Sequence, residues 1–224
     1  MQRMLSDLKN RMVPDTRKPR TIVTGAFQGI KLDLSLRNQF QLYAGLYERE
    51  LYPWLRRLTK GAVTAVDLGA SYGEFTLYFL KAGVETVYAF EPDAECFGLF
   101  EKNLRLNAYF DPARVILSSK RIGAADSEGE ARLDSCVAAF RYPCVIKMDI
   151  EGGEVAALEG ACRLNTKADV RWLIETHSKA LEAECLRILS EESFRTRIIS
   201  PAWWRAALPE LRPLESNRWL AAWK

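Results

Sequence analysis

The residues best suited to chemistry stand in a stretch that reads VDLGASYGEFT, residues 66–76. Glycines in a turn between a strand and a helix let a ligand approach the backbone, because no Cβ atom intervenes. A dinucleotide site has the spacing G-x-G-x-x-G, whereas Gly69 and Gly73 form G-x-x-x-G, with Asp67 two positions earlier. A carboxylate there would repel a pyrophosphate and suit an ammonium group. The loop therefore predicts a cationic, amino-acid-like ligand.

A second acidic residue, Glu91, ends the next apolar run. It stands 22 positions after Gly69, close to the spacing of about 20 at which an acidic residue binds ribose hydroxyls in nucleotide-binding βαβ units. Pro92 ends the strand, and Asp93 is a candidate N-cap for the helix that follows. A ligand with a ribose and an amino-acid end points to S-adenosylmethionine. The alternative is a plain tight turn with a solvated Glu91.

A third group of charges, Lys147, Asp149, Glu151 and Glu154, crowds the end of a later strand. Lys147 and Asp149 share one face of it, because side chains alternate along a strand. These carboxylates could bind a divalent metal, orient a substrate hydroxyl or cap the next helix, whose N-terminus favours acids. Capping is the alternative for Glu151 and Glu154, whereas Asp149, at the strand tip, is the functional candidate.

The one histidine of the chain, His177, follows Glu175 just past another strand. An imidazole that titrates near neutral pH could take the proton of an acceptor hydroxyl during methyl transfer. The alternative is a histidine that hydrogen-bonds to a loop backbone. Asp149 is the second candidate base, assisted by Lys147. Asp149, Glu175 and His177 could also form an oxygen-rich metal site, but no metal is assigned.

Alternating strands and helices are predicted to position these residues. The sequence pattern predicts strands over 62–67, 87–91, 114–118, 144–149, 171–176, 195–199 and 218–223, and helices up to 82 and over 93–107, 154–164 and 179–190. Two short strands are expected around a turn within 122–133. This order predicts an α/β fold with a doubly wound, mostly parallel sheet and helices on both faces. Ligands bind such sheets beyond the carboxyl ends of the strands.

The first 60 residues stand apart from this alternation. Residues 21–32 are compatible with a hairpin that turns near Gly25, and residues 36–59 are predicted as helix, divided by Pro53. We therefore expect a basic tail and helical extension over 1–60, which serves as a lid or as a homodimer contact. Residues 61–224 are expected to form the S-adenosylmethionine-binding domain.

Four segments together resemble the FkbM-type methyltransferases: VDLGASYGEFT (66–76), AFEPD (89–93), IKMDIEGGE (146–154) and LIETH (173–177). The resemblance runs from about residue 60 to about residue 190. It implies an S-adenosylmethionine-dependent enzyme of the Rossmann-like class that methylates a hydroxyl of a sugar or secondary metabolite. It also implies that Asp149 touches the methionine end of the cofactor or the acceptor.

In this enzyme class an acidic residue after the third strand often accepts a hydrogen bond from the adenine amino group, a role that Asp126 would take. The alternative is that Asp126 belongs to a turn. The predicted cofactor contacts are Asp67, Gly69, Ala70, Gly73, Thr76, Glu91, Pro92, Asp126 and Asp149. The predicted catalytic residues are His177, Asp149 and Lys147.

Composition excludes several other classes of protein. With 48% hydrophobic and 27% charged residues, the 224-residue chain has enough apolar residues for a core, which excludes a disordered or fibrous protein. No apolar run reaches the ~18 residues that a membrane span needs, and the N-terminus does not resemble a secretory signal. Five cysteines without a CxxC pair predict reduced thiols and a cytoplasmic protein.

The charge distribution and the motifs also argue against three other functions. Six basic and two acidic residues give residues 1–20 a charge of +4, so the other residues carry −1 of the total +3. A nucleic-acid methyltransferase would show a basic face on its folded domain, and the acidic Asp-Ile-Glu-Gly after the fourth core strand suits a flipped base poorly. A non-catalytic module with the same cofactor fold is the second rival. An NAD-dependent reductase is disfavoured because G-x-G-x-x-G is missing.

Overall fold

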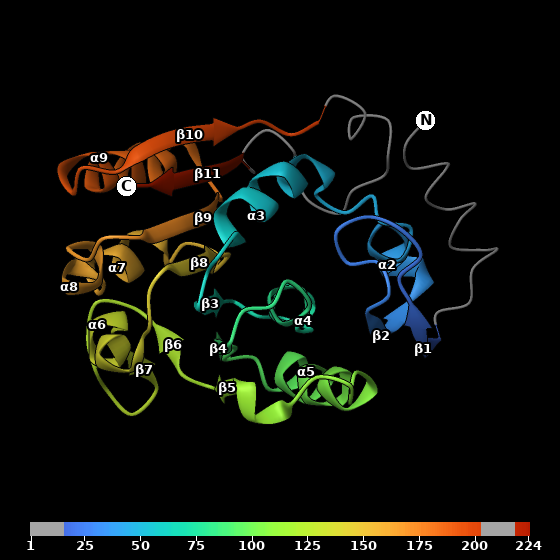
Figure 1. The fold of residues 1–224 in the computed structure, drawn as a ribbon. Helices are drawn as coiled ribbons and strands as arrows, with labels where there is room; N and C mark the ends of the chain where they lie inside the picture. The colour runs from blue at the N-terminus through green and yellow to red at the C-terminus, as the bar shows by residue number, and fades with distance from the viewer. Residues whose placement is uncertain (1–15, 203–217) are drawn as a thin grey trace.

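The apolar runs of the chain form one seven-stranded sheet in the computed structural model, which describes residues 16–202 and 218–224 (Figure 1). Its strands are β3 (Thr64–Leu68), β4 (Thr86–Phe90), β5 (Val115–Ser118), β8 (Cys144–Met148), β9 (Val170–Thr176), β10 (Arg195–Ile199) and β11 (Arg218–Trp223). They lie in the order β10-β11-β9-β8-β3-β4-β5. β11 runs antiparallel to both neighbours, and the other pairs are parallel. The predicted mostly parallel sheet is confirmed.

Helices cover both faces of this sheet, as predicted (Figure 1). The α-helices of the described residues are α2 (Leu36–Tyr43), which packs on the N-terminal hairpin, α3 (Tyr52–Thr59), α4 (Glu74–Lys81), α5 (Ala94–Leu106), α6 (Leu133–Cys136), α7 (Glu154–Glu159), α8 (Cys162–Asn165) and α9 (Lys179–Glu191). Successive strand residues point to opposite sides. Val145 therefore packs in the core that contains α3 and α4, whereas Ile146 packs in the core that contains α7 and α9.

Two predicted helices are divided differently from the expectation. The segment 36–59 breaks between Ala44 and Glu48, where Glu48 adopts left-handed backbone with φ 45°. Pro53 instead lies in the first turn of α3, where its missing N–H costs no hydrogen bond. The predicted helix 154–164 consists of the short α7 and α8, which are separated at Gly160 and Ala161.

The N-terminal segment begins with a hairpin of β1 (Arg17–Thr21) and β2 (Lys31–Ser35), which pair antiparallel. The expected turn at Gly25 lies in their connecting loop. Two buried asparagines, Asn103 in α5 and Asn107 at its C-cap, bind the backbone of β2. Asn103 Oδ1 accepts from Asp33 N at 2.8 Å, and Asn107 Oδ1 accepts from Lys31 N at 2.9 Å. These side chains tie the hairpin to α5, because they accept hydrogen bonds from backbone N–H groups of β2.

A cluster of aromatic rings joins the same segment to α4. Phe27, fully buried in the hairpin loop, meets Tyr52, Phe75 and Tyr78 in edge-to-face contacts with ring centroids 5.3–6.0 Å apart. The part expected as a helical extension thus contains a strand pair as well as helices, and it shares a core with α4. The division at residue 60, and the role as a lid or dimer contact, stay predictions; residues 1–15 of the basic tail lie outside the described residues.

Residues 121–131 contain the two expected short strands, β6 (Arg121–Ile122) and β7 (Glu130–Ala131), which pair parallel to each other. The backbone turns between them at residues 127–129, where Ser127 N donates to Glu130 O. In the described part of the chain, no helix is long and apolar enough to cross a bilayer.

Replacing Phe27 with alanine tests whether the N-terminal segment is part of the folded core. We expect Phe27→Ala to lower the free energy of unfolding by about 3–5 kcal/mol, because it leaves a cavity between the hairpin and α4. Phe40→Ala is the matched control: Phe40 is 47% exposed, and its loss should cost about 1 kcal/mol or less. Urea denaturation of both variants measures the difference. Equal costs would show that the hairpin loop packs loosely.

Candidate functional site

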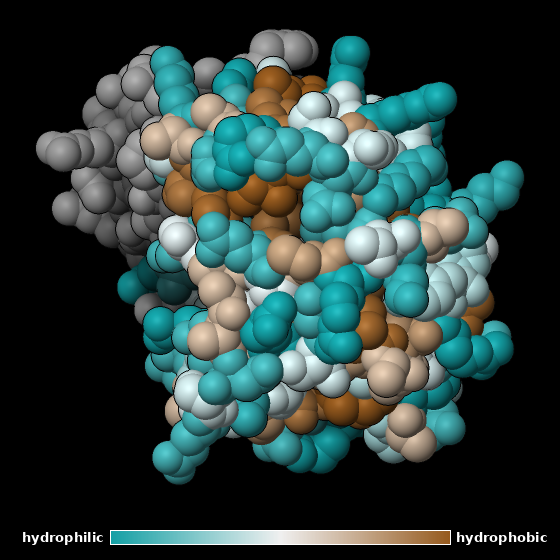
Figure 2. Space-filling model, turned by 90° about the vertical axis from the view of Figure 1, so that its left-hand side faces the viewer, coloured by the Kyte–Doolittle hydropathy of each residue, from teal (hydrophilic) through white to brown (hydrophobic). Residues whose placement is uncertain are grey.

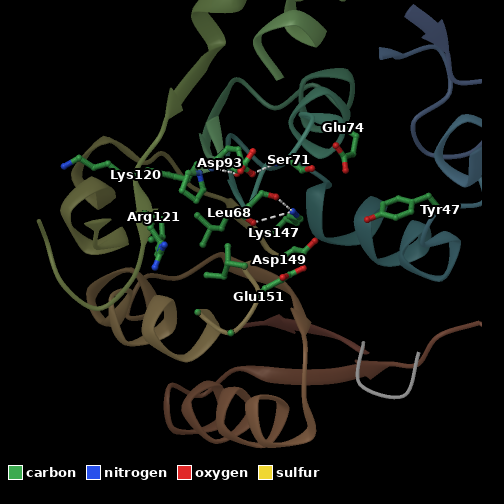
Figure 3. Close-up of a pocket in the computed structure, with 18 residues that line it drawn as sticks. Tyr47, Leu68, Ser71, Glu74, Asp93, Lys120, Arg121, Lys147, Asp149 and Glu151 are labelled. Atoms are coloured by element: carbon green, nitrogen blue, oxygen red, sulfur yellow. Dashed lines mark hydrogen bonds between the residues drawn. The ribbon is translucent and has the colours of Figure 1, made fainter. Parts of the chain in front are cut away.

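A cavity of about 680 Å³ opens at the carboxyl ends of β3, β4 and β8 (Figure 3). β3 has β4 on one side and β8 on the other, so the connections from β3 and β8 lead to opposite halves of the sheet at this point. It is the place where doubly wound sheets bind ligands. The lining consists of Tyr47, Leu68, Gly69, Ser71, Glu74, Phe90, Glu91, Pro92, Asp93, Lys120, Arg121, Ile122, Lys147, Asp149, Ile150, Glu151, Gly152 and Gly153.

Two glycines shape the loop between β3 and α4. Gly69 has φ +70°, and a Cβ atom on it would lie 1.8 Å from the carbonyl oxygen of Asp149. Gly73 has φ +84°, and its Cβ would lie 2.3 Å from the ring of Phe100. Only glycine fits either position. At Gly69 this lets the loops after β3 and β8 touch, and at Gly73 it makes room for the Phe100 ring of α5. Gly69 lines the cavity, whereas Gly73 and the buried Ala70 lie behind the lining.

Asp67 lies beneath the cavity rather than on its wall. Its side chain is fully buried; one oxygen accepts a hydrogen bond from Thr76 Oγ1 at 2.7 Å, and the other pairs with Lys147 Nζ at 3.4 Å. Burial raises the pKa of Asp67, although Lys147 and Thr76 act against that shift. The expectation that Asp67 and Thr76 contact a ligand is therefore corrected: both support the floor of the cavity from inside.

Lys147 connects this floor to the cavity. Its ammonium group donates to the carbonyl oxygen of Gly69 at 2.7 Å and lies 5.0 Å from the centre of the Phe75 ring. Burial by itself lowers the pKa of Lys147, but the carboxylates of Asp67, Asp149 and Glu74 raise it by more. Lys147 is therefore a cation. Lys147 lies on the lining of the cavity, and its catalytic role stays a prediction.

Glu91 stands on the cavity wall in a fixed orientation. Its Oε2 accepts from Ser71 N at 2.7 Å, and its Oε1 accepts from Asp93 N at 2.9 Å. Each carboxylate oxygen has a further lone pair for a ligand donor. Pro92 lies beside it on the lining, and Asp93 caps α5 through a 2.8 Å bond from Cys96 N, as expected.

Carboxylates surround His177 on two sides. The distance from its Nδ1 to Glu154 Oε1 is 2.6 Å, and its Nε2 lies 3.3 Å from Asp149 Oδ1 and 3.9 Å from Glu175 Oε2. Burial by itself lowers the pKa of His177, but the hydrogen bonds to Asp149 and Glu154 raise it to about 10. A pKa of about 10 favours the doubly protonated ring at neutral pH, in which neither nitrogen accepts a proton. The role of His177 as general base stays a prediction, and this charge argues against it.

The same cluster brings together the three residues considered for a metal. Ligand atoms of Asp149, Glu175 and His177 all lie within 4.8 Å of one another. Burial raises the pKa of Asp149, but His177 and Lys147 outweigh it and hold that pKa well below its usual range. An imidazolium between carboxylates accounts for these contacts. A metal ion in place of its proton stays a prediction.

Asp126 is not in the cavity. Its Oδ1 accepts from Arg132 N at 2.9 Å, its Oδ2 accepts from Ser135 Oγ at 2.6 Å, and its side chain is exposed. Asp126 is thus held by the start of α6 and is not among the lining residues, which argues against the adenine contact. Residues 120–122, at the end of β5 and the start of β6, line the cavity near β4 instead.

Several lining residues escaped the sequence prediction. Ser71 and Glu74 belong to the predicted loop and the first turn of α4, and the rule that ligands bind at strand ends also points to Lys120. These three could have been found from the pattern. Tyr47 could not, because it follows α2, and only the packing of the N-terminal segment brings it to the cavity.

No family model matches the chain, and no curated protein matches it in sequence. Solved structures do match in fold. Methyltransferase FkbM from Methylobacillus flagellatus KT aligns with 22% identity and a TM-score of 0.59 over 72% of this chain and 44% of that one. The chain has the class I methyltransferase fold. It spans less than half of the length of that FkbM structure.

Two further methyltransferases share this fold. Precorrin-6y C5,15-methyltransferase from Geobacter metallireducens GS-15 aligns over 80% of this chain and 89% of that one, with 12% identity and a TM-score of 0.52. An rRNA methylase from Streptococcus thermophilus aligns over 79% and 96%, with 14% identity and a TM-score of 0.52. At these identities the class I fold is what the proteins have in common, and their substrates differ.

The protonation of His177 predicts how stability depends on pH. The pKa is about 10 in the folded protein and about 6.5 in an unfolded chain. The stabilisation is complete below pH ~6.5 and is lost as the pH rises through ~10. The free energy of unfolding should therefore fall by up to ~1.4 kcal/mol per pH unit between these values, and His177→Gln should remove that part of the slope.

Urea denaturation at pH 7, 8 and 9 measures this dependence for the wild-type protein and the variant. Arg187→Gln is the control, because it removes only exposed ion pairs of α9 and should change stability by ~0.5 kcal/mol or less at each pH. A stability difference between wild type and His177→Gln that stays constant from pH 7 to pH 9 would contradict the imidazolium.

Proposed function

We propose that the chain is an S-adenosylmethionine-dependent methyltransferase that methylates a hydroxyl of a small molecule, sugar or secondary metabolite. The observation that carries the proposal is Glu91. Backbone amides of Ser71 and Asp93 orient its oxygens on the wall of the cavity, beside Gly69. A carboxylate at the end of the second strand of such a sheet binds ribose hydroxyls, and the fold is that of class I methyltransferases.

The rest of the cavity fits this cofactor. Its volume of about 680 Å³ lies within the range of about 300–1,000 Å³ for small-molecule sites. Phe90, Ile122 and Ile150 supply apolar surface for a base. Toward the other end, Glu74 and Lys147 offer opposite charges for a zwitterionic amino acid (Figure 3). When bound, the cofactor would supply a methyl group on a positively charged sulfur.

The acceptor is proposed to bind near Asp149. Asp149 lines the cavity and has its Oδ1 3.3 Å from Nε2 of His177, so its carboxylate can accept a hydrogen bond from an acceptor hydroxyl. Its low pKa makes it a weak base, so its main effect would be to align the hydroxyl, and alignment alone gives large rate gains. Lys147 and His177 keep it charged and in place.

The charge of the cavity near Asp149 distinguishes a small-molecule methyltransferase from a nucleic-acid methyltransferase, and catalytic turnover distinguishes it from a non-catalytic module. Glu74, Asp149 and Glu151 line that part of the cavity, and carboxylates repel the phosphates of a nucleic acid. Incubation with methyl-labelled S-adenosylmethionine and a panel of sugars, polyols and phenols tests catalysis directly. Label in one of these acceptors supports the enzyme. Tight cofactor binding without label in any acceptor favours the non-catalytic module.

Calorimetric titration with S-adenosylhomocysteine tests the cofactor site. We expect micromolar affinity for the wild-type protein. Glu91→Gln should weaken binding by about 10- to 100-fold, because it removes charge-assisted hydrogen bonds worth about 1.5–3 kcal/mol. Glu95→Gln is the control: Glu95 is exposed in the first turn of α5 and is not among the lining residues.

The two variants separate the parts of the proposal. Equal binding by wild type, Glu91→Gln and Glu95→Gln would remove the ribose assignment but leave the cofactor. The absence of binding by the wild-type protein would remove the cofactor itself. Membership of the FkbM-type family, the cytoplasmic location and a homodimer through the N-terminal helices stay proposals beside this one.

A further inference from the structure

One carboxylate of the cavity is buried without a partner. Glu74, the first residue of α4, is 6% exposed and lines the cavity, and its Oε2 has no hydrogen-bond partner. Among the residues that the structure describes, no ion pair reaches it. A buried polar atom without a partner is costly, and proteins keep such atoms mainly where something else supplies the missing contact.

The other charged lining groups at this end already have partners. Lys147 is bonded to Gly69 O at 2.7 Å and pairs with Asp67 at 3.4 Å. Asp149 lies 3.3 Å from the imidazole of His177. Glu74 Oε2, by contrast, accepts no hydrogen bond, and no ion pair within 4 Å holds this carboxylate among the described residues, although the charge of Lys147 acts on it. A ligand that carries an ammonium group would supply both.

We propose that Glu74 binds the ammonium group at the amino-acid end of the cofactor, and that this contact expels a proton from the protein. The inference rests on the proposed function and deepens it, since it assigns to Glu74 the role that the sequence assigned to Asp67. Lys147, on the lining of the same cavity, then faces the carboxylate of that amino acid. The negative charge of Glu74 and the positive charge of Lys147 are thus complementary to the two charges of a zwitterionic amino acid.

The surroundings of Glu74 explain why ligand binding would release a proton from its carboxyl group. Burial raises its pKa to about 7, Lys147 on β8 lowers it, and Asp67 on β3 and Asp149 beyond β8 raise it. Two phenols, Tyr47 and Tyr72, also lie within its electrostatic field. Near neutral pH the free protein is thus a mixture of both protonation states. An ammonium group close to the carboxylate favours the ionised state, so the bound protein must release a fraction of a proton.

Calorimetry with S-adenosylhomocysteine at pH 7 in phosphate and in Tris, which differ in ionisation enthalpy, counts the protons released. We expect about half a proton per bound ligand, given a pKa of about 7. Affinity should rise roughly tenfold from pH 6 to pH 8, because less Glu74 must lose its proton before binding. 5′-Methylthioadenosine, which has the nucleoside but no amino-acid end, should bind without proton release.

Glu74→Gln should abolish the proton release and lower the affinity for S-adenosylhomocysteine at least tenfold. The affinity for 5′-methylthioadenosine should stay within about threefold of the wild-type value. Wild-type binding without proton release, or release that persists in Glu74→Gln, overturns the inference and leaves the proposed function intact. No binding of either ligand overturns both. If Glu74→Gln fails to fold, the difference between the two ligands on the wild-type protein decides the question.

Discussion

The buried ammonium group of Lys147 is the interaction on which the ligand-facing edge of the sheet depends. Lys147 stands opposite Asp67 in the parallel pairing of β8 with β3, so strand register alone brings the two charges together. A shift by one residue would turn Lys147 toward the other face of the sheet and leave Asp67 as an unpaired charge in the core. Because the same ammonium also bonds Gly69 O, it connects the loop after β3 to β8.

This one cation divides the nearby carboxylates into two kinds. Asp149 receives the charges of both Lys147 and His177, which keep it ionised. Burial raises the pKa of Glu74 by more than the charge of Lys147 lowers it, so that pKa lies near neutrality, at about 7. Two carboxyl groups in one cavity thereby take different protonation states, which is how a single site can hold a fixed anion beside a group that responds to its ligand.

The sequence predicts the edge of the sheet well because strand ends obey simple rules. The alternation of strands and helices places Gly69, Glu91 and Asp149 at one crevice, and all three line the cavity. It does not predict which way an individual charge points. Asp67 precedes Gly69 by two residues, yet it faces inward because its partner comes from β8, 80 positions along the chain.

The protonation state of His177 cannot be predicted from the sequence either, because it depends on residues that are distant along the chain. A histidine next to a strand tip suggests a base, and only the tertiary contacts with Glu154 and Asp149 turn it into a held cation. Asp126 shows the opposite case. Its hydrogen-bond partners, Arg132 and Ser135, lie within nine positions along the chain, so its structural role is a local one.

The two ends of the cavity follow from different parts of the chain. The end near Glu91 is built from strand termini of the βα core, whereas Tyr47 comes from a segment that is held by the hairpin, the buried asparagines of α5 and the ring of Phe27. Under the proposed function, residues that bind the cofactor are thus encoded in the sheet. The end near Glu74 and Asp149 instead includes Tyr47, whose position depends on how the N-terminal segment packs. Changes in that segment are therefore expected to alter this end of the cavity while the wall around Glu91 is kept.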